Sequence, residues 1–149
     1  MTLKERLNED MKQAMKAREA GKERLSVIRL ARAAIKYAEI DRRHELSDEE
    51  VLEVLAREVK QRRDAILEYQ KANRPEAVAA LEREMNIVLG YLPRQMSADE
   101  IRALAREVVA QVGARDGKDM GKVMGALMPK VKGRADGKLV NQIGRELLP

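Results

Sequence analysis

The chain has 149 residues, of which 44% are hydrophobic and 37% charged, and its formal net charge is +5. This length suits one ordinary domain or two small ones, and the hydrophobic content argues against a wholly disordered chain. Aromatic residues make up only 2%, which favours helices over sheets. The absence of cysteine excludes disulfides, thiolate metal sites and cysteine nucleophiles. No apolar run reaches the length of a membrane span, and the acidic residues near Met1 fit neither a secretory nor a transit peptide, so we expect a cytoplasmic protein.

Apolar residues recur at helical spacing over most of the first 90 residues. They form four stripes: Leu3, Leu7, Met11 and Met15; Leu25, Ile28, Ala31, Ile35 and Ala38; Val51, Leu55, Val59 and Ile66; and Val78, Leu81, Met85, Val88 and Leu89. Gly21 separates the first two predicted helices, and Ser47 begins a capping box for the third. Pro75 suits the first turn of the fourth helix and Gly90 its end. The pattern predicts a helical bundle or a pair of helical hairpins.

The helical periodicity breaks at residues 91–96, and Ser97 then begins a second capping box. The helix that follows places its apolar residues largely on one side and ends at Gly113. We therefore predict an all-α fold with a domain boundary after residue 96. An N-terminal helical domain spans residues 1–96, and a small three-helix domain spans residues 97–149.

An internal repeat occupies the second domain. Residues 113–118 and 133–138 differ only in the order of Ala and Arg, and the apolar positions after them keep the same offset as far as Pro129 and Pro149. Each copy predicts a glycine turn followed by one short helix. Neither short helix can bury its apolar face alone, so both should pack on each other and on the helix before them.

Residues suited to catalysis are few. His44 is the one histidine, and Asp41, Glu45 and Asp48 could in principle complete a metal site with it. Clusters of this kind in a loop between helices are usually turn and capping residues. Two of the three serines are explained as helix N-caps, and no Ser/His/Asp arrangement can be assembled. The sequence thus predicts no catalytic residue and no metal site.

The glycines and lysines between Gly117 and Val123 do not form a known nucleotide-binding motif. A phosphate-binding loop needs four residues between its glycines and a Ser or Thr after its lysine. A dinucleotide-binding fingerprint needs a strand before its glycines, and none is predicted here. We therefore expect no cofactor.

The segment from Gly113 to Arg145 is strongly basic, and its excess of positive charge equals the net charge of the whole chain. Positive charge near helix N-termini, where backbone N–H groups point outward, suits phosphate groups. The candidate RNA-binding residues are Lys118, Lys122, Lys130, Lys132, Arg134 and Lys138, and the glycines that shape their turns are Gly117, Gly121, Gly125, Gly133 and Gly137. The alternative is a solvated rim that keeps the domain soluble, and the residues alone leave both interpretations open.

Three of these glycines, Gly117, Gly121 and Gly125, are four residues apart, so a helix through them would expose a strip without side chains. Such a strip more often admits a neighbouring helix than a ligand. With the nearby methionines, the strip supports a second hypothesis, in which the C-terminal domain docks on the helix of a partner protein. These methionines are Met120, Met124 and Met128.

A second basic face is predicted on the helix over residues 22–43. Its cations are Arg24, Arg29, Arg32, Lys36, Arg42 and Arg43. Helices that lie on membranes normally add Trp, Phe or a broad Leu face, and the apolar stripe of this helix is expected to face the core. We therefore expect no membrane association.

The stretch from Lys118 to Val140, KDMGKVMG followed after one residue by LMPKVKGRADGKLV, resembles the GatB/YqeY family. LNEDMK at residues 7–12, KERLSVIRL at 22–30 and YLP at 91–93 support the resemblance over essentially the full chain. The chain is similar to free-standing YqeY-like proteins, whose helical region is shared with the tail of the B subunit of glutamine-dependent aspartyl/glutamyl-tRNA amidotransferase. The resemblance implies an α-helical fold with a larger N-terminal and a smaller C-terminal domain.

The resemblance also implies a link to tRNA, because the tail of that enzyme contacts tRNA while catalysis lies elsewhere. We expect a tRNA-binding accessory protein, acting alone or beside an aminoacyl-tRNA synthetase or an amidotransferase, with neither DNA nor membrane as its partner. Activity as a carbon–nitrogen ligase with glutamine as amido-N-donor would be inherited from the family alone, since no residue can be assigned to it. The few tyrosines lie outside the basic segment, so RNA should be bound through its backbone and shape.

Overall fold

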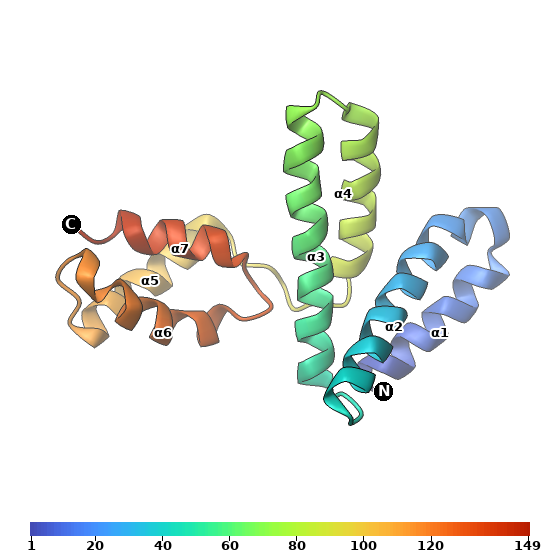
Figure 1. Cartoon of the computed structure of the whole chain (residues 1–149), viewed down its shortest axis with the longest axis horizontal. Helices are drawn as coiled ribbons and strands as arrows, with labels where there is room; N and C mark the ends of the chain where they lie inside the picture. The colour runs from blue at the N-terminus through green and yellow to red at the C-terminus, as the bar shows by residue number, and fades with distance from the viewer. The chain divides into compact units, whose positions relative to one another are not determined.

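The computed structural model describes residues 1–149 and contains seven α-helices and no strand, which confirms the predicted all-α fold class (Figure 1). The helices are α1 (Leu3–Lys16), α2 (Lys22–Arg42), α3 (Asp48–Lys71), α4 (Pro75–Leu89), α5 (Ala98–Val112), α6 (Met120–Val131) and α7 (Gly137–Glu146). Two short 3₁₀ helices join them: η1 (Arg18–Gly21) between α1 and α2, and η2 (Gly117–Asp119) before α6.

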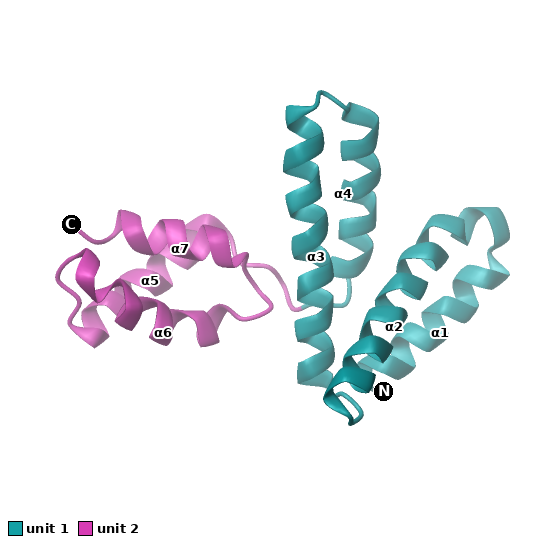
Figure 2. Cartoon of the chain, in the orientation of Figure 1, with its two compact units in different colours: residues 1–92 teal, residues 93–149 magenta.

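The chain divides into two compact units, Met1–Leu92 with α1 to α4 and Pro93–Pro149 with α5 to α7 (Figure 2). Each unit has its own cluster of buried apolar side chains. Residues 93–96, assigned to the N-terminal domain from the sequence, lie with the second unit. The Gln95 amide donates to the Gly133 carbonyl at 2.9 Å, and the Met96 backbone N–H donates to the Arg134 carbonyl at 2.8 Å.

Capping boxes fix the start of three helices. The two predicted from the sequence, at Ser47 and Ser97, are both present, with each hydroxyl accepting from the backbone N–H three residues later at 3.2 Å. A third capping box at Thr2, whose hydroxyl accepts from the Glu5 N–H at 3.1 Å, was not identified in the sequence. Each such cap stabilises its helix by about 1 kcal/mol.

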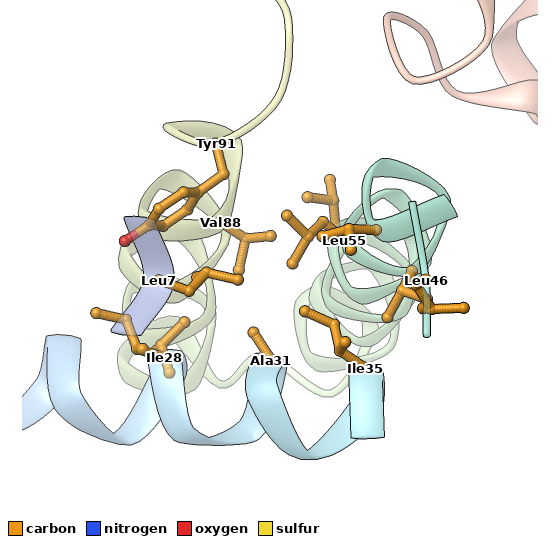
Figure 3. Close-up of a cluster of buried hydrophobic side chains, with 12 residues drawn as sticks. Leu7, Ile28, Ala31, Ile35, Leu46, Leu55, Val88 and Tyr91 are labelled. Atoms are coloured by element: carbon orange, nitrogen blue, oxygen red, sulfur yellow. The ribbon is translucent and has the colours of Figure 1, made fainter. Parts of the chain in front are cut away.

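The first unit consists of two helical hairpins, α1 with α2 and α3 with α4, which is one of the two arrangements that the pattern predicts. Figure 3 shows that its core combines side chains from all four helices, among them Leu7, Ile28, Leu55 and Val88. The predicted stripes of α2 and α3 face this core.

The stripe predicted for α1 is wrong at its end, because Met15 is half exposed and Ala14 is buried instead. The cause lies in the following turn. A Cβ atom added to Gly21 would lie 2.2 Å from the Ala14 carbonyl oxygen, so η1 packs backbone against backbone on α1. Only glycine fits this position, and its close approach covers Ala14, which lies on the same helix face as Leu7 and Met11.

Tyr91 closes the first unit just after α4. Its ring is buried in the core, and its hydroxyl donates to the Asp10 carboxylate at 2.5 Å. The Arg24 guanidinium lies within 3.4 Å of both the Tyr91 hydroxyl and Asp10, and the Arg6 guanidinium lies 4.6 Å from the centre of the ring. Arg6 also donates to the Gly90 carbonyl at 3.0 Å. The end of α4 is therefore held by side chains of both α1 and α2.

Arg62 is the one charged side chain in the interior of the first unit. Its guanidinium donates to the Glu58 carboxylate one turn earlier at 3.2 Å, and its Nε lies 3.4 Å from the Glu84 carboxylate of α4. A buried cation needs such compensation, so the three residues join α3 to α4 electrostatically.

Candidate nucleic-acid interface

The sequence repeat corresponds to a repeated turn in the second unit. Gly113 and Gly133, at equivalent positions of the two copies, both have the left-handed backbone conformation, with φ of 68° and 74°. Gly113 caps the C-terminus of α5, and Gly133 follows the end of α6. This conformation strains most residues with a Cβ, so the turns favour glycine at these two positions.

An aspartate completes each turn three residues later. The Asp116 carboxylate accepts from the Lys118 N–H at 2.9 Å, and the Asp136 carboxylate accepts from the Lys138 N–H at 3.3 Å. Each copy is thus a glycine turn with an aspartate cap leading into one short helix, as the repeat predicts. The backbone N–H groups of Lys118 and Lys138 already have carboxylate acceptors, so any phosphate contact by these residues rests on their ammonium groups.

The remaining motif glycines have no such backbone requirement. A Cβ atom added to Gly117, Gly121 or Gly125 would meet no atom within 4 Å, and one added to Gly137 would make an ordinary contact with Met128. Gly121 and Gly125 are exposed on α6, on the side opposite the buried Val123 and Leu127. No helix of the second unit packs against them.

Pro129 continues this bare strip at the end of α6, where it is also exposed. Proline has no backbone N–H, so the carbonyl of Gly125 lacks its α-helical hydrogen-bond donor. The Pro129 ring takes the place of that donor. The exposed side of α6, which we call the glycine face (Gly121, Gly125 and Pro129), therefore presents backbone without side chains at Gly121 and Gly125.

The contact between α6 and α7 shows how the cations are distributed. Met120 at the start of α6 packs on Gly144 near the end of α7, and Met128 near the end of α6 approaches Gly137 at the start of α7. The two helices are therefore antiparallel. Their ends divide the six candidates into two groups. Lys118 and Lys122 belong to one end of the helix pair, and Lys130, Lys132, Arg134 and Lys138 belong to the other.

The lysines of α6 differ in their partners. The Lys122 ammonium is exposed and lies 3.9 Å from the Asp119 carboxylate. Lys130 is exposed and has no ion-pair partner. Both flank the glycine face at helical spacing, about 12 Å apart along the axis. Lys118 precedes them and is exposed on η2. We call Lys118, Lys122 and Lys130 the α6 row.

Arg134 has a structural task. Its side chain is half-buried, and its Nε donates to the Arg94 carbonyl at 3.2 Å, while its own carbonyl accepts from the Met96 N–H. It fastens residues 94–96 to the second glycine turn.

The methionines of α6 are partly buried and pack within the second unit, so only part of their surface is left for the protein-docking hypothesis. A Cβ atom at Gly144 would lie 2.9 Å from the Met120 side chain and 3.6 Å from that of Met124. Met124 and Met128 pack on the core of the unit. Gly144 thus allows α6 and α7 to approach, a role that sequence analysis missed. The available signal was the repeat offset, which pairs Gly144 with the bulky Met124.

The residues considered for catalysis lie in helix caps. The His44 Nδ1 is 2.8 Å from the Glu45 carbonyl, and its Nε2 is 3.6 Å from the Glu50 carboxylate. The hydroxyls of Ser47 and Ser97 cap α3 and α5. No group of three or more His, Asp or Glu side chains is placed to bind a metal ion.

The comparison with protein families covers both units. A family model described as Yqey-like protein matches residues 4–148. The chain belongs to the YqeY family. This confirms the resemblance inferred from residues 118–140, and the match includes the turns, the glycine face and both lysine groups. A comparison with curated proteins found no match to this YqeY-family chain. None of its helices is both long and apolar enough to cross a membrane.

Proposed function

We propose that this YqeY-family protein is an accessory protein that binds tRNA through its second unit. The observation that carries the proposal is the glycine face of α6, which is open to solvent and flanked by Lys118, Lys122 and Lys130. A ligand can approach the bare backbone closely there while the ammonium groups reach its anionic groups.

RNA backbone fits this surface better than nucleobases do. The second unit contains no aromatic residue on which a base could stack, whereas phosphates need only cations at suitable spacing. RNA also carries the ribose 2′-hydroxyl, a hydrogen-bond donor and acceptor that DNA lacks. A folded tRNA offers phosphates and 2′-hydroxyls together on a fixed surface.

Substitution of the α6 row by alanine tests the proposal. A variant with Lys118, Lys122 and Lys130 changed to Ala should bind tRNA more weakly, and the slope of log affinity against log salt should fall by about one for each lysine that contacts a phosphate. The measurement is a titration of full-length protein into labelled tRNA at several salt concentrations. Arg134 is kept because its loss would disturb the fold.

The matched control removes the same charge elsewhere. A variant with Lys16, Lys60 and Lys71 changed to Ala should keep both the affinity and the salt slope of the wild type, since these exposed lysines lie in the first unit. Equal affinity and slope for all three proteins would reject the α6 row as the RNA contact.

The second candidate function, docking on a translation-related protein partner, is favoured by one observation. No atom lies within 4 Å of the Cβ positions of Gly121 and Gly125, so the strip has room for another helix. Capture of partners before and after ribonuclease treatment separates the two functions. A partner bound through this face after RNA removal would support docking, whereas loss of all binding to this face would support RNA.

A further inference from the structure

The helix α2 carries a second apolar strip, on the side away from the core. Leu30, Tyr37 and Ile40 are 53%, 73% and 64% exposed, although all three are large hydrophobic residues. Together with Ala33, they follow the spacing of one helix face. The first unit buries the opposite side of α2, so no part of it covers this strip, which we call the α2 strip (Leu30, Ala33, Tyr37 and Ile40).

A cavity of about 410 Å³ lies beside the α2 strip, between α2 and α1. Ala33 belongs to both, so the strip and the cavity are continuous. The floor of the cavity includes the buried Leu7 and Ile35. Its polar lining residues are mostly cations: Lys4, Arg29, Arg32 and Lys36, against Glu39 as the one carboxylate.

The positive charge of this cavity is only partly compensated. Lys4 is paired with Glu39 at 2.7 Å. Arg29 and Lys36 have no carboxylate partner, and the Arg32 guanidinium has only the Met11 sulfur at 2.8 Å. The apolar α2 strip therefore runs beside a cavity in which most of the cations have no carboxylate partner.

We propose that the α2 strip and the cavity beside it bind an acidic amphipathic helix of a partner protein. Apolar side chains of such a helix would cover Leu30, Tyr37 and Ile40, which is the usual arrangement of a helix in a groove. Arg29 and Lys36 are seven residues apart, about 10.5 Å along α2. Carboxylates two turns apart on the partner match this distance.

The residues of the α2 strip and of the cavity disfavour RNA and membranes as ligands. Leu30 and Ile40 are aliphatic, and covering them with the phosphates and riboses of RNA would gain little hydrophobic free energy. A membrane-binding helix needs a broad apolar face, whereas this strip has three large residues and a concave, charged flank. The inference concerns the first unit and does not depend on tRNA binding by the second.

A peptide selection tests the proposal on the full-length protein. The probe is a displayed library of peptides of about 16 residues, with leucines fixed at helical spacing and all other positions randomised. Selected peptides should be enriched in Asp and Glu beside the leucines. The best peptide, synthesised and labelled, should lose about tenfold or more in affinity for Leu30→Asp and for Ile40→Asp. An Arg29→Glu, Lys36→Glu double variant should prefer peptides with Lys in place of Glu.

Matched variants complete the test. Leu67→Asp alters a leucine of almost equal exposure, 51%, on α3, and Arg106→Glu reverses an exposed charge on α5. Both should bind the peptide as the wild type does, and circular dichroism should show all variants folded. Selection without acidic enrichment, or binding unaffected by Leu30→Asp, would overturn the proposal. So would wild-type binding to vesicles of anionic lipid, or to tRNA, that is lost on the same Leu30→Asp change.

Discussion

Single residues near the helix ends make polar interactions that change the pKa of their partners. Burial of the Tyr91 ring, and then its hydrogen bond to Asp10, raise the pKa of the hydroxyl to about 12. Tyr91 therefore remains a neutral donor that joins α4 to α1. In the second unit, the Arg94 guanidinium donates two hydrogen bonds to the Glu100 carboxylate, at 3.0 and 2.8 Å, beside the Ser97 cap.

The pH dependence of stability should reveal the Glu100 interaction. The bond from Arg94, and then that from the Ser97 backbone, lower the pKa of Glu100 from 4.5 to about 2. Because the folded-state pKa is the lower one, this stabilisation is complete above pH 4.5 and is lost as the pH falls to 2. Glu100→Gln keeps the capping geometry but not the charge. Thermal unfolding should show a lower Tm for this variant at neutral pH, and the difference from the wild type should shrink toward zero as the pH falls through 2.

The control for this prediction is Glu107→Gln, which removes an exposed carboxylate of the same helix. Its Tm should follow that of the wild type at every pH. If the Tm difference between Glu100→Gln and the wild type stayed constant from neutral pH to pH 2, the charge of Glu100 would not be the source of that difference.

At the scale of elements, α6 combines two kinds of glycine contact. Its outer side exposes Gly121 and Gly125, where no atom would meet a Cβ, and its inner side packs Met120 on Gly144 of α7. Helix propensity alone would favour alanine at the two outer positions. Their glycines thus cost α6 stability without serving the packing of the unit, which fits a surface that a partner approaches closely.

Alanine at these positions should separate stability from binding. Gly121→Ala and Gly125→Ala should each raise the free energy of unfolding of the second unit by about 0.5–1 kcal/mol, because alanine loses less backbone entropy on folding. The same variants should bind tRNA more weakly, since a methyl group would stand on the glycine face. Denaturant unfolding and tRNA titration of the same preparations measure the two effects.

Gly144→Ala supplies the comparison on the inner side of the contact. Its Cβ would lie 2.9 Å from the end of the Met120 side chain, which must then shift, so this substitution should stabilise the unit less than the two outer ones. A lower free energy of unfolding for Gly121→Ala than for the wild type would contradict the open glycine face. Unchanged tRNA affinity for both outer variants would place the RNA contact away from it.

At the scale of the whole molecule, two separate cores should give two separable stabilities. Leu127 is fully buried in the second unit and Leu55 in the first. Leu127→Ala should destabilise the second unit by about 2–5 kcal/mol, a large part of the stability of so small a unit. Hydrogen exchange should then show loss of protection in α5 to α7 while α1 to α4 remain protected, and Leu55→Ala should show the converse. Equal loss in both units for either variant would mean that they unfold as one.

Local patterns predicted much of this molecule, and most of what was missed depends on contacts between distant residues. The capping box at Thr2 is the exception, because Thr2 and Glu5 lie within four consecutive residues. Ser47 and Ser97 were recognisable because a capping box lies within four consecutive residues. The buried stripes of α2 and α3 were visible for a similar reason. The burial of Ala14 in place of Met15 depends on Gly21, which approaches it only after the chain has turned.

The candidate sites likewise combine features that are visible in the sequence with features that depend on packing between distant residues. The six basic residues were visible as a charge excess, but their separation into two ends of a helix pair follows from the packing of α6 on α7. The structural role of Arg134 depends on a carbonyl 40 residues earlier in the chain. Leu30 and Tyr37 of the α2 strip lie outside the core stripe predicted for this helix, but only the structure shows that no other part of the first unit covers them. The RNA-binding role of the basic residues and the docking role of the α2 strip remain predictions.

The anchoring of the chain on either side of Leu92 has a mechanical consequence. Before it, Tyr91 is held by Asp10 and Arg24, and after it, residues 94–96 are hydrogen-bonded to the second glycine turn. A pull along the chain would therefore load these side-chain and backbone bonds instead of unwinding the end of α4 or the start of α5. Only Leu92 and Pro93 lie between the two anchors, and the proline ring fixes one backbone angle of the second.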